Sequence, residues 1–500
     1  MINVLVYIVD ALRADHLGCH GYGRETSPNI DRLAAESETV RFSRAFAPST
    51  WTKPIAASIL SGCYPPAHGV RTRSDLFLKA VPRLPELLQA AGYQTAAVST
   101  IGNVSSSLGF AIGFDHFNDL YKDPSLVARR EVSNTGAWKL YFEQDTTVVL
   151  PLAEDVNEHA FTWLDGATGQ EKPWFLFLWA LDPHDPYYPP SGFDRWSDPG
   201  YGGRIDGSAE SVRQVRNQAD VQRLLDLYDG EIAYTDTQFG LLLQRLRELE
   251  VFDDTLIVVA GDHGEAFGEH GDFVHGHLAY DEVMHVPLLI KMPRGKKRVP
   301  ADVRKSCGAL VQLTDIAPTI LDVLGMAEEA SEMQGKSLLP VLEGVSESDR
   351  AVYAETQSSI ANNRLLAVRT ERWKYLKVAP PAALDGEQHG SQTTGWQRRM
   401  QGYWQHLTNP EMVKKLVRNP MFYMRRQMAD REMLFDLKAD PGEQHNVIGG
   451  FPEVADGMRG LLADWLEQCH AYARISDQQA AGLGLDDETR RQLEGLGYLQ

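Results

Sequence analysis

The chain has 500 residues, of which 43% are hydrophobic and 23% charged, the composition of an ordinary globular protein. This length suits one large α/β domain plus a smaller one. The formal net charge of −19 argues against nonspecific nucleic-acid binding, because nothing would offset the repulsion between the chain and the phosphates. An anionic ligand would therefore need a metal ion or local cations.

The chain begins with Met-Ile-Asn-Val-Leu-Val-Tyr-Ile-Val-Asp, which reads as a buried strand over residues 3–9 that ends at Asp10. This run lacks a basic leader and a small-residue cleavage site, so we do not expect a signal peptide. No run of about 18 apolar residues occurs elsewhere, so we expect no membrane span. The four scattered cysteines have no metal-type spacing, and we predict a cytoplasmic protein with reduced thiols.

Apolar runs that suit buried parallel strands recur along the chain, with helical patterns between them. We expect strands at 3–9, 95–99, 174–180, 255–260 and 286–291, and helices at 28–36, 82–92, 152–165, 219–249 and 313–324. This alternation predicts an α/β fold with a mostly parallel sheet and helices on both faces.

Polar side chains follow three of these strands directly. Asp10 follows the first, Asp182 and His184 follow strand 174–180, and Asp262 and His263 follow strand 255–260. Ligands of such sheets bind at the carboxyl ends of the strands. We therefore expect these side chains to share one rim.

The large domain is expected to span 1–360 and a small C-terminal α+β subdomain 361–480. Within the latter, apolar and charged residues alternate over 364–378, which predicts an antiparallel hairpin with one solvated face, and a further apolar run follows at 433–437. Residues 380–430 are rich in Gln, Arg and aromatics and are predicted to form a helical insertion. Residues 481–500 are predicted to form a tail helix.

The segment 49–62, Ser-Thr-Trp-Thr-Lys-Pro-Ile-Ala-Ala-Ser-Ile-Leu-Ser-Gly, places a hydroxyl residue, Thr52, at the start of a short helical pattern. A helix start offers unpaired N–H groups and a positive dipole end, so it favours anions and ionised nucleophiles. An N-cap role for Thr52, which contributes about 1 kcal/mol, would place it at the same helix end.

Gly261-Asp262-His263-Gly264-Glu265 is the second strong motif. A carboxylate and an imidazole that are adjacent at a strand end can turn toward one cation, although such a pair alone is more often a loop with local hydrogen bonds. With Asp10 and Thr52 they form a candidate metal site of three oxygens and one nitrogen. This set suits Mn²⁺, Zn²⁺ or Mg²⁺ better than a soft metal.

A divalent cation at this site would activate the Thr52 hydroxyl, which is a weak nucleophile near neutral pH. The hydroxyl oxygen would then attack phosphorus or sulfur in line, expel an alcohol and leave a covalent ester for water to cleave.

Histidines cluster after the metal motif, since five of the fifteen lie between residues 263 and 285. His275 and His277 sit in a glycine-bearing loop, where one of them is a candidate to protonate the leaving alcohol or to bind a substrate oxygen. His184, in the Pro-rich segment that follows Asp182, is a candidate contact for the substrate anion. Surface histidines without a function are the alternative for each one alone.

Together these segments resemble the sulfatase family of the alkaline phosphatase superfamily over nearly the whole chain. The resemblance extends to Val-Asp10-Ala-Leu-Arg13-Ala-Asp15, to Ser61-Gly62-Cys-Tyr-Pro-Pro-Ala-His68-Gly69, and to the C-terminal Leu-Phe-Asp-Leu-Lys-Ala-Asp-Pro-Gly-Glu-Gln-His-Asn-Val. It implies an alkaline phosphatase-like fold and a metal-dependent ester hydrolase.

The departures from the family pattern bear on the reaction. Sulfatases carry paired aspartates near the start, but Ala11 follows Asp10 here, and Ala56 stands where they carry Arg. Their nucleophilic Cys is converted to formylglycine, and Thr52 at that position cannot undergo the conversion, so no formylglycine is expected. Asn103, near the place of the usual Lys and His, is a candidate substrate-binding residue. The Asp, Thr, Asp, His set resembles that of phosphoglycerol transferases and is close to that of phosphonate monoester hydrolases.

We therefore expect a metal-dependent hydrolase of phosphate or phosphonate mono- or diesters, with a small anionic ester as substrate and no nucleic-acid or membrane partner. A sulfate-ester hydrolase without formylglycine, a phosphoryl transferase, and a binding protein on a decayed hydrolase scaffold are the alternatives. The oligomeric state stays open, a homo-oligomer included.

Overall fold

The computed structural model describes residues 1–73, 75–78, 81–123, 126, 151–295, 305–343, 350–358, 363–379 and 431–480. The predicted helical insertion at 380–430 and the predicted tail helix at 481–500 lie outside the described residues.

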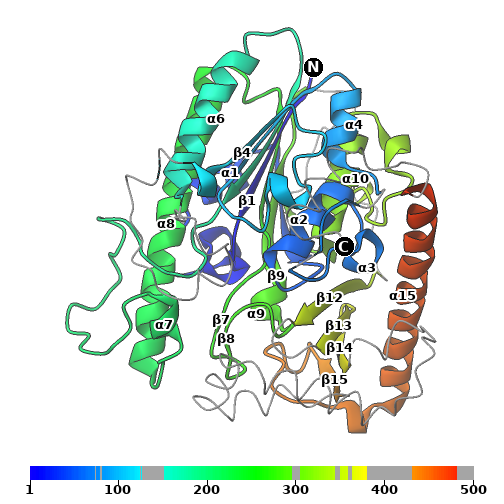
Figure 1. The fold of residues 1–500 in the computed structure, drawn as a ribbon. Coiled ribbons are helices and arrows are strands. Elements are labelled where there is room, and N and C mark those ends of the chain that lie inside the picture. Colours follow the sequence, from blue (N-terminus) through cyan, green and yellow to red (C-terminus); the bar gives the residue numbers. More distant parts are fainter. Residues whose placement is uncertain are drawn as a thin grey trace.

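A nine-stranded sheet forms the centre of the molecule (Figure 1). Its main path runs β10-β2-β9-β6-β1-β5-β3-β4, with β11 paired to β2. The strands are β1 Asn3–Val9, β2 Thr39–Phe46, β3 Gln94–Ser99, β4 His116–Asp119, β5 Trp174–Ala180, β6 Thr255–Gly261, β9 His285–Lys291, β10 Ser306–Cys307 and β11 Val311–Gln312. The sheet is mostly parallel, as predicted.

Two details of this sheet differ from the prediction. Strand β9 is antiparallel to both β6 and β2, so the apolar run at 286–291 was wrongly expected to be parallel. The sequence also gave no sign of β2, because Arg41 and Arg44 interrupt its apolar residues. A strand buried on both faces reads as hydrophobic whichever way it runs, so direction is not encoded in the run itself.

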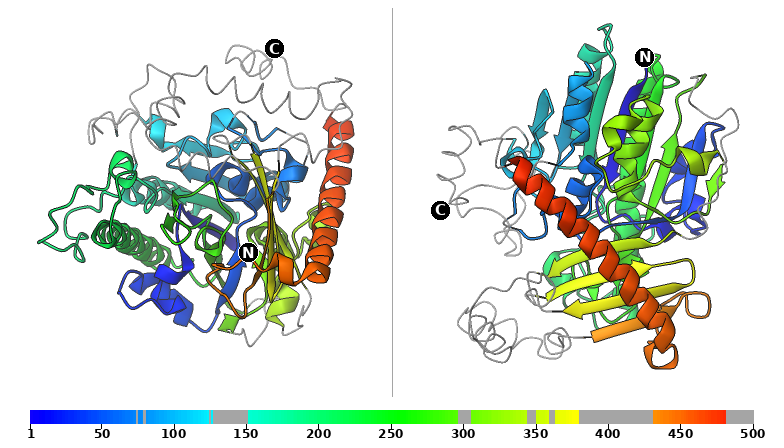
Figure 2. Two further views of the ribbon diagram at one scale, coloured as in Figure 1. Left: turned by 90° about the horizontal axis from the view of Figure 1, so that it is seen from below. Right: turned by 90° about the vertical axis from the view of Figure 1, so that its right-hand side faces the viewer.

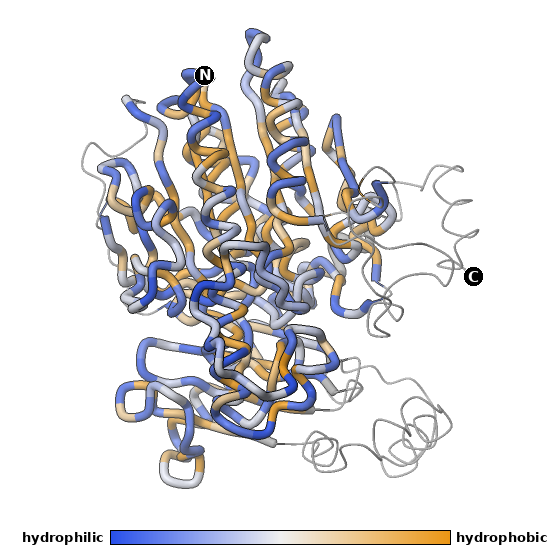
Figure 3. Tube along the Cα trace, turned by 90° about the vertical axis from the view of Figure 1, so that its left-hand side faces the viewer, coloured by the Kyte–Doolittle hydropathy of each residue, from blue (hydrophilic) through white to orange (hydrophobic). Residues whose placement is uncertain are grey.

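Helices cover both faces of the sheet because successive side chains of a strand point to opposite sides. Along β1, Val4, Val6 and Ile8 join one core cluster and Leu5, Tyr7 and Val9 join the other. Helices α6 and α8 lie over one face, and α2 and α10 lie over the other (Figure 1). Figure 3 shows the hydrophobic segments gathered on these interior elements.

The helices in the described part of the chain vary in length from 4 residues to 31 residues. Helix α8 has 31 residues, about 46 Å at 1.5 Å per residue, and the Asn217 side chain caps its start by accepting from the Asp220 amide. The bounds are α1 Pro28–Ala35, α2 Thr52–Ser61, α3 Pro65–His68, α4 Leu84–Ala90, α6 Ala153–Ala167, α7 Ala209–Val212, α8 Gln218–Glu248, α9 Asp281–Met284, α10 Ile316–Val323, α11 Leu339–Leu342 and α15 Pro452–Ala480. None of the described helices is long and apolar enough to cross a membrane.

A second, antiparallel sheet lies beside the first and is crossed by α15 (Figure 2). Its strands in order are β12 Val352–Ser358, β13 Asn363–Arg369, β14 Trp373–Ala379 and β15 Arg431–Asp436. The pairing of β13 with β14 confirms the predicted hairpin. Because β12 precedes residue 361, the small sheet begins earlier than the predicted subdomain, whose boundary stays a prediction.

Side chains alternate across this second sheet as well. Leu366 and Val368 face the cluster that contains α15, whereas Leu365 and Ala367 face Phe46 at the end of β2. The small sheet is therefore held between α15 and the edge of the central sheet.

Candidate active site

Three neighbouring central strands deliver polar residues to one edge of the sheet. In the parallel register of β1, Val9 pairs with Ala180 of β5 and with Gly261 of β6. The residues that follow these positions are Asp10, the segment 181–185, and Asp262 with His263. The predicted shared rim is thus present.

Thr52 approaches this rim from the start of α2. Its hydroxyl Oγ1 lies 3.5 Å from Asp10 Oδ2 and 3.4 Å from His263 Nε2, and only 2% of the residue is exposed. Trp51 occupies the N-cap position, and Thr52 is the first helical residue. The capping alternative for Thr52 is therefore wrong, and the hydroxyl is turned to the carboxylate and imidazole.

The inner oxygens of both aspartates are fixed by hydrogen bonds. Asp262 Oδ1 accepts from the amides of Ala11 at 3.0 Å and His263 at 2.7 Å, and Asp10 Oδ2 accepts from Trp179 Nε1 at 3.0 Å. Asp10 Oδ1 and Asp262 Oδ2 are buried and form no hydrogen bond with the described residues. Buried oxygens of this kind are costly without a partner, so they are turned toward a place for a cation.

The imidazole of His263 completes this arrangement. Its Nδ1 donates to the Gly264 carbonyl at 2.9 Å, which leaves Nε2 facing Asp10 Oδ1 at 3.5 Å and Asp262 Oδ2 at 3.3 Å. Ligand atoms of Asp10, Asp262 and His263 all lie within 4.8 Å of one another. Together with the nearby Thr52 hydroxyl, these residues fit a divalent cation of the hard or borderline type.

Electrostatics support the same conclusion. Burial raises the pKa of Asp10 to about 6. Burial and the neighbouring Asp10 carboxylate raise the pKa of Asp262 well above its usual value. Burial lowers the pKa of His263, so this imidazole is neutral and able to act as a ligand. Two carboxylates crowded in a buried site favour a positive charge between them.

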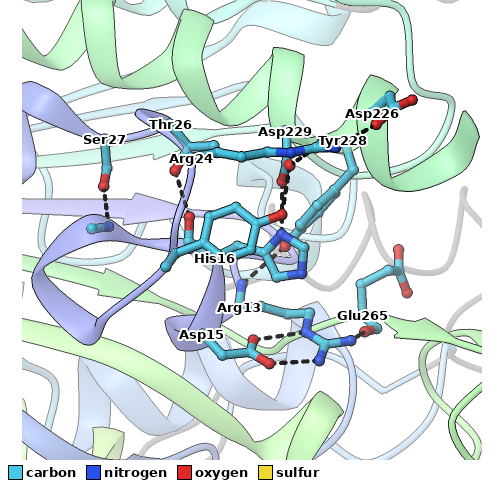
Figure 4. A network of polar contacts seen from close by, with 12 residues as sticks. Arg13, Asp15, His16, Arg24, Thr26, Ser27, Asp226, Tyr228, Asp229 and Glu265 are labelled. Atoms are coloured by element: carbon cyan, nitrogen blue, oxygen red, sulfur yellow. Dashed lines mark hydrogen bonds and ion pairs between the residues drawn. The ribbon is translucent and has the colours of Figure 1, made fainter. Parts of the chain in front are cut away.

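Tyr228 of α8 holds the backbone of the loop that follows Asp10 (Figure 4). Its hydroxyl donates to the Ala11 carbonyl at 2.7 Å and accepts from the Arg13 amide at 2.9 Å. Arg13 in turn donates to the Glu265 carbonyl at 2.9 Å and forms an ion pair with Asp15. This network ties the first strand end to the Asp262 motif, and Ala11 contributes its amide where sulfatases carry a second aspartate.

Two of the predicted histidines adjoin the metal cluster. The ring of His275 lies 4.1 Å from that of His263 and 4.8 Å from that of His184 between centroids. The His275 Nδ1 contacts Glu265 Oε1 at 3.1 Å, and Tyr187 donates its hydroxyl to Glu265 Oε2 at 2.9 Å. The histidines at 184 and 275 are thus brought together with the candidate metal ligands Asp10, Asp262 and His263.

His184 carries the positive charge of this group. Burial alone would lower its pKa, but Asp185, Asp10 and Glu265 override burial and raise the pKa to about 9. The pKa of His275 falls to about 3 because of burial and the neighbouring His184.

The other two candidates occupy loops of the same region. His277 is half-buried, two residues beyond His275, and a Cβ added at the intervening Gly276 would lie 3.8 Å from Trp51 Cβ, so this loop passes beside the start of α2. Asn103 is half-buried on the loop that follows β3. Their roles in substrate binding or proton transfer stay predictions.

Sequence reasoning missed several residues that shape the site, namely Glu265, Asp185, Tyr187, Tyr228 and Trp179. Glu265 stands inside the Gly-Asp-His-Gly-Glu motif, and its placement after a buried strand was a usable signal. Tyr228 lies in the middle of a long helix, where nothing in the sequence marks it.

The chain is similar to known proteins over most of its length. The family model described as Sulfatase matches residues 2–326. The N-acetylglucosamine-6-O-sulfatase of Bacteroides thetaiotaomicron is 24% identical over 98% of this chain and 90% of its own length. The multifunctional alkaline phosphatase superfamily protein PehA of Trinickia caryophylli is 25% identical over 77% of this chain and 88% of its own length.

Among solved structures, the phosphonate monoester hydrolase of Agrobacterium radiobacter superposes with a TM-score of 0.66 at 20% identity, covering 94% of this chain and 96% of that one. The likeness shows the shared fold, and the family model spans well over half of the sequence. The chain belongs to the sulfatase family and is a hydrolase of sulfuric or phosphoric esters.

Proposed function

We propose that this hydrolase cleaves phosphate or phosphonate esters with the Thr52 hydroxyl as its nucleophile. The observation that carries the proposal is the position of Thr52 Oγ1, 3.5 Å from Asp10 Oδ2 and 3.4 Å from His263 Nε2 at the buried start of α2. An unmodified hydroxyl beside an acidic cation site is suited to attack on phosphorus.

Asp10, Thr52, Asp262 and His263 would hold the divalent cation, with Mn²⁺, Zn²⁺ or Mg²⁺ favoured over Ca²⁺. When bound, such a cation supplies Lewis acidity that lowers the pKa of a hydroxyl and neutralises charge on phosphoryl oxygens. The chain itself orients the ligands, because Trp179, Ala11 and the His263 amide fix one oxygen of each aspartate. All four of these side chains are buried, at 0–2% exposure, so the cation site is shielded from bulk solvent.

The reaction is a double displacement. The Thr52 hydroxyl loses its proton and its oxygen attacks phosphorus, while the bond between phosphorus and the leaving oxygen breaks and that oxygen takes up a proton. Water then attacks the phosphothreonine, the bond from phosphorus to Thr52 Oγ1 breaks, and Thr52 regains a proton. In this proposal His184, whose pKa is raised to about 9 by the carboxylates around it in spite of burial, contacts the substrate anion or protonates the leaving oxygen.

Sulfate-ester hydrolysis is the second candidate, favoured by the sulfatases among the relatives. Against it stands the local chemistry, since Thr52 replaces the Cys that becomes formylglycine, and the neighbouring Arg position holds Ala56, which is fully buried in the apolar core.

The test uses purified protein stripped of metal and reloaded with Mn²⁺, Zn²⁺, Mg²⁺ or Ca²⁺. Aryl phosphate mono- and diesters, phosphonate esters and sulfate esters are assayed side by side, and we expect a phosphorus ester to give the highest kcat/KM. A preference for sulfate over every phosphorus ester would overturn the proposal.

A substitution series isolates the nucleophile. Thr52→Ala should lower kcat by roughly three orders of magnitude or more, because the attacking atom is gone, whereas Thr52→Ser keeps a hydroxyl and should retain measurable turnover. Thr237→Ala on α8 is the matched control, because it removes a threonine hydroxyl that donates a hydrogen bond to the Ala233 carbonyl. It should leave kcat unchanged. Unchanged activity in Thr52→Ala would remove Thr52 as the nucleophile.

A further inference from the structure

The segment that leads into helix α2 is held by a strand of the small C-terminal sheet. The amide of Glu355 on β12 donates to the Pro48 carbonyl at 3.0 Å. The next residue of β12, Thr356, places its hydroxyl Oγ1 2.9 Å from Ser49 Oγ and 2.8 Å from Thr50 Oγ1. The same oxygen accepts from the Thr50 amide at 2.9 Å, so residues 306 positions apart are joined two positions before the proposed nucleophile.

The Thr356 hydroxyl uses its full hydrogen-bonding capacity in these contacts. A hydroxyl donates one hydrogen bond and accepts two. Because Thr356 Oγ1 accepts from the Thr50 amide, it donates to one of the hydroxyls of Ser49 and Thr50 and accepts from the other. Ser49 and Thr50 are fully buried and Thr356 is 2% exposed, so bulk water does not replace a lost partner.

We propose that Thr356 is a positioning residue for the Thr52 nucleophile, so that the small C-terminal sheet holds the attacking oxygen in place. This inference deepens the proposed reaction and rests on Thr52 as its nucleophile. The Thr356 side chain acts through residues 49–51 and takes no part in the bond changes at phosphorus.

The N-cap residue of α2 is one that cannot cap a helix. Trp51 occupies this position with an extended backbone, and its indole offers a donor but no acceptor for the amides of the first turn. Only Trp51 separates the anchored Thr50 from Thr52. A displacement of Thr50 is therefore passed on to the Thr52 hydroxyl, and the contacts with Thr356 take over the part that a side-chain cap usually has.

The geometry of the site makes small displacements costly. Thr52 Oγ1 lies 3.5 Å from Asp10 Oδ2 and 3.4 Å from His263 Nε2. A misplacement of about 1 Å in an active site can lower the rate by roughly 100-fold. Loss of the Thr356 hydroxyl would leave the buried Thr50 amide without this acceptor, and the segment would have to shift to satisfy it.

Steady-state kinetics of Thr356→Val test the inference, because valine keeps the shape of threonine and removes its hydroxyl. On the ester with the highest kcat/KM, we expect kcat to fall by about 10–100-fold and KM to change by less than about twofold. Thr356→Ser retains the hydroxyl and should keep kcat within about threefold of the wild type.

Thr319→Val on α10 is the matched control. Thr319 is 1% exposed, and its hydroxyl donates to the Asp315 carbonyl at 2.6 Å and accepts from the Leu338 amide at 2.9 Å. The substitution removes buried hydrogen bonds of the same kind, away from the nucleophile segment. It should lower the urea midpoint and leave kcat unchanged.

A double-mutant cycle separates positioning from a general structural role. In Thr52→Ala there is no hydroxyl to position, so adding Thr356→Val should not lower the residual kcat further. A further loss by the same factor, an unchanged kcat in Thr356→Val, or equal losses in Thr356→Val and Thr319→Val would overturn the inference. Ser49→Ala and Thr50→Val each remove one hydroxyl contact from the other side, should lower kcat less, and carry the test if Thr356→Val does not fold.

The result does not depend on which ester is cleaved. A preference for sulfate would overturn the proposed phosphoester reaction and leave the effect of Thr356 intact. An unchanged kcat in Thr356→Val together with a large loss in Thr52→Ala would overturn only the positioning role. Unchanged activity in Thr52→Ala would overturn both.

Discussion

Ala11 has a left-handed backbone, with φ of 57°, directly after the predicted metal ligand Asp10. A non-glycine residue in this region costs on the order of 1 kcal/mol and is retained where the surroundings fix it. Here Ala11 donates its amide to Asp262 and accepts at its carbonyl from Tyr228. The left-handed turn after Asp10 is thus tied to Asp262 through the Ala11 amide and to α8 through the Ala11 carbonyl.

The Tyr228 hydroxyl provides a test of this connection. In Tyr228→Phe, the Ala11 carbonyl and the Arg13 amide lose a buried partner, so we expect the free energy of unfolding to fall by about 1–3 kcal/mol. We also expect metal affinity to fall by roughly 10–100-fold, because the loop that carries Asp10 is released. Denaturant unfolding and metal titration measure the two effects.

Tyr7→Phe is the matched control for this substitution. Tyr7 is also a fully buried tyrosine, but its hydroxyl forms no hydrogen bond with the described residues. Its removal should leave both stability and metal affinity unchanged or slightly raise the stability. Equal losses in the two variants would contradict a specific role for Tyr228.

At the scale of elements, the sequence predicts what strand ends carry but not how strands are directed. Asp10, Asp262 and His263 could be placed together because each follows a buried apolar run, and parallel strands end at one edge. The reversed direction of β9 and the existence of β2 could not be predicted, because pairing partners are chosen by tertiary packing. Contacts such as Glu265 with His275 depend on loop conformations that leave no periodic pattern in the sequence.

The sequence predicts an α+β subdomain over 361–480 but no single long helix in it. Aromatic residues pack helix α15 against the rest of the molecule. The ring of Trp465 stacks on Tyr353 of β12 at a centroid distance of 5.2 Å and meets Tyr64 edge-on at 5.3 Å. Trp465 is 4% exposed, so the helix is fastened to both the small sheet and the segment after α2.

Truncation of the Trp465 side chain should therefore weaken the packing of α15 against both the small sheet and the segment after α2. We expect Trp465→Ala to lower the free energy of unfolding by about 3–5 kcal/mol, the usual cost of removing a large buried ring. Leu461→Ala, which changes a 37% exposed residue of the same helix, should cost far less. Urea unfolding of both variants measures these losses. Similar midpoints for Trp465→Ala and Leu461→Ala would show that the Trp465 contacts of α15 contribute little to stability.

At the scale of the whole molecule, the two sheets are joined through a buried charged cluster. Lys374 of β14 is fully buried and pairs with Asp281 of α9 at 2.8 Å and with Glu443 at 2.7 Å. The Asp281 amide also donates to Glu443 Oε2 at 2.7 Å. Because α9 follows the loop that carries His275, this cluster connects the C-terminal part of the chain to the active site.

His270 extends the cluster and makes it sensitive to pH. Its Nδ1 contacts Glu282 Oε1 at 2.6 Å, its Nε2 contacts the Glu443 carbonyl at 3.2 Å, and its ring stacks on Tyr280 at 3.6 Å. Burial alone would lower the pKa of His270, but these partners raise it above the ordinary value of 6.5. The folded state therefore holds this proton more tightly than the unfolded state.

This difference has a definite sign in stability. The contribution of His270 is fully present below pH 6.5, the unfolded value, and is lost as the pH rises through the higher folded pKa. The wild type should thus lose stability as the pH rises above 6.5 and through the folded pKa, and His270→Gln should lose less, because glutamine cannot gain a charge. Urea midpoints measured below pH 6.5 and in a rising series above it give the difference, with His116→Gln as the exposed control that should follow the wild type. An identical decline in His270→Gln and the wild type would show that the connection between the two sheets does not titrate through His270.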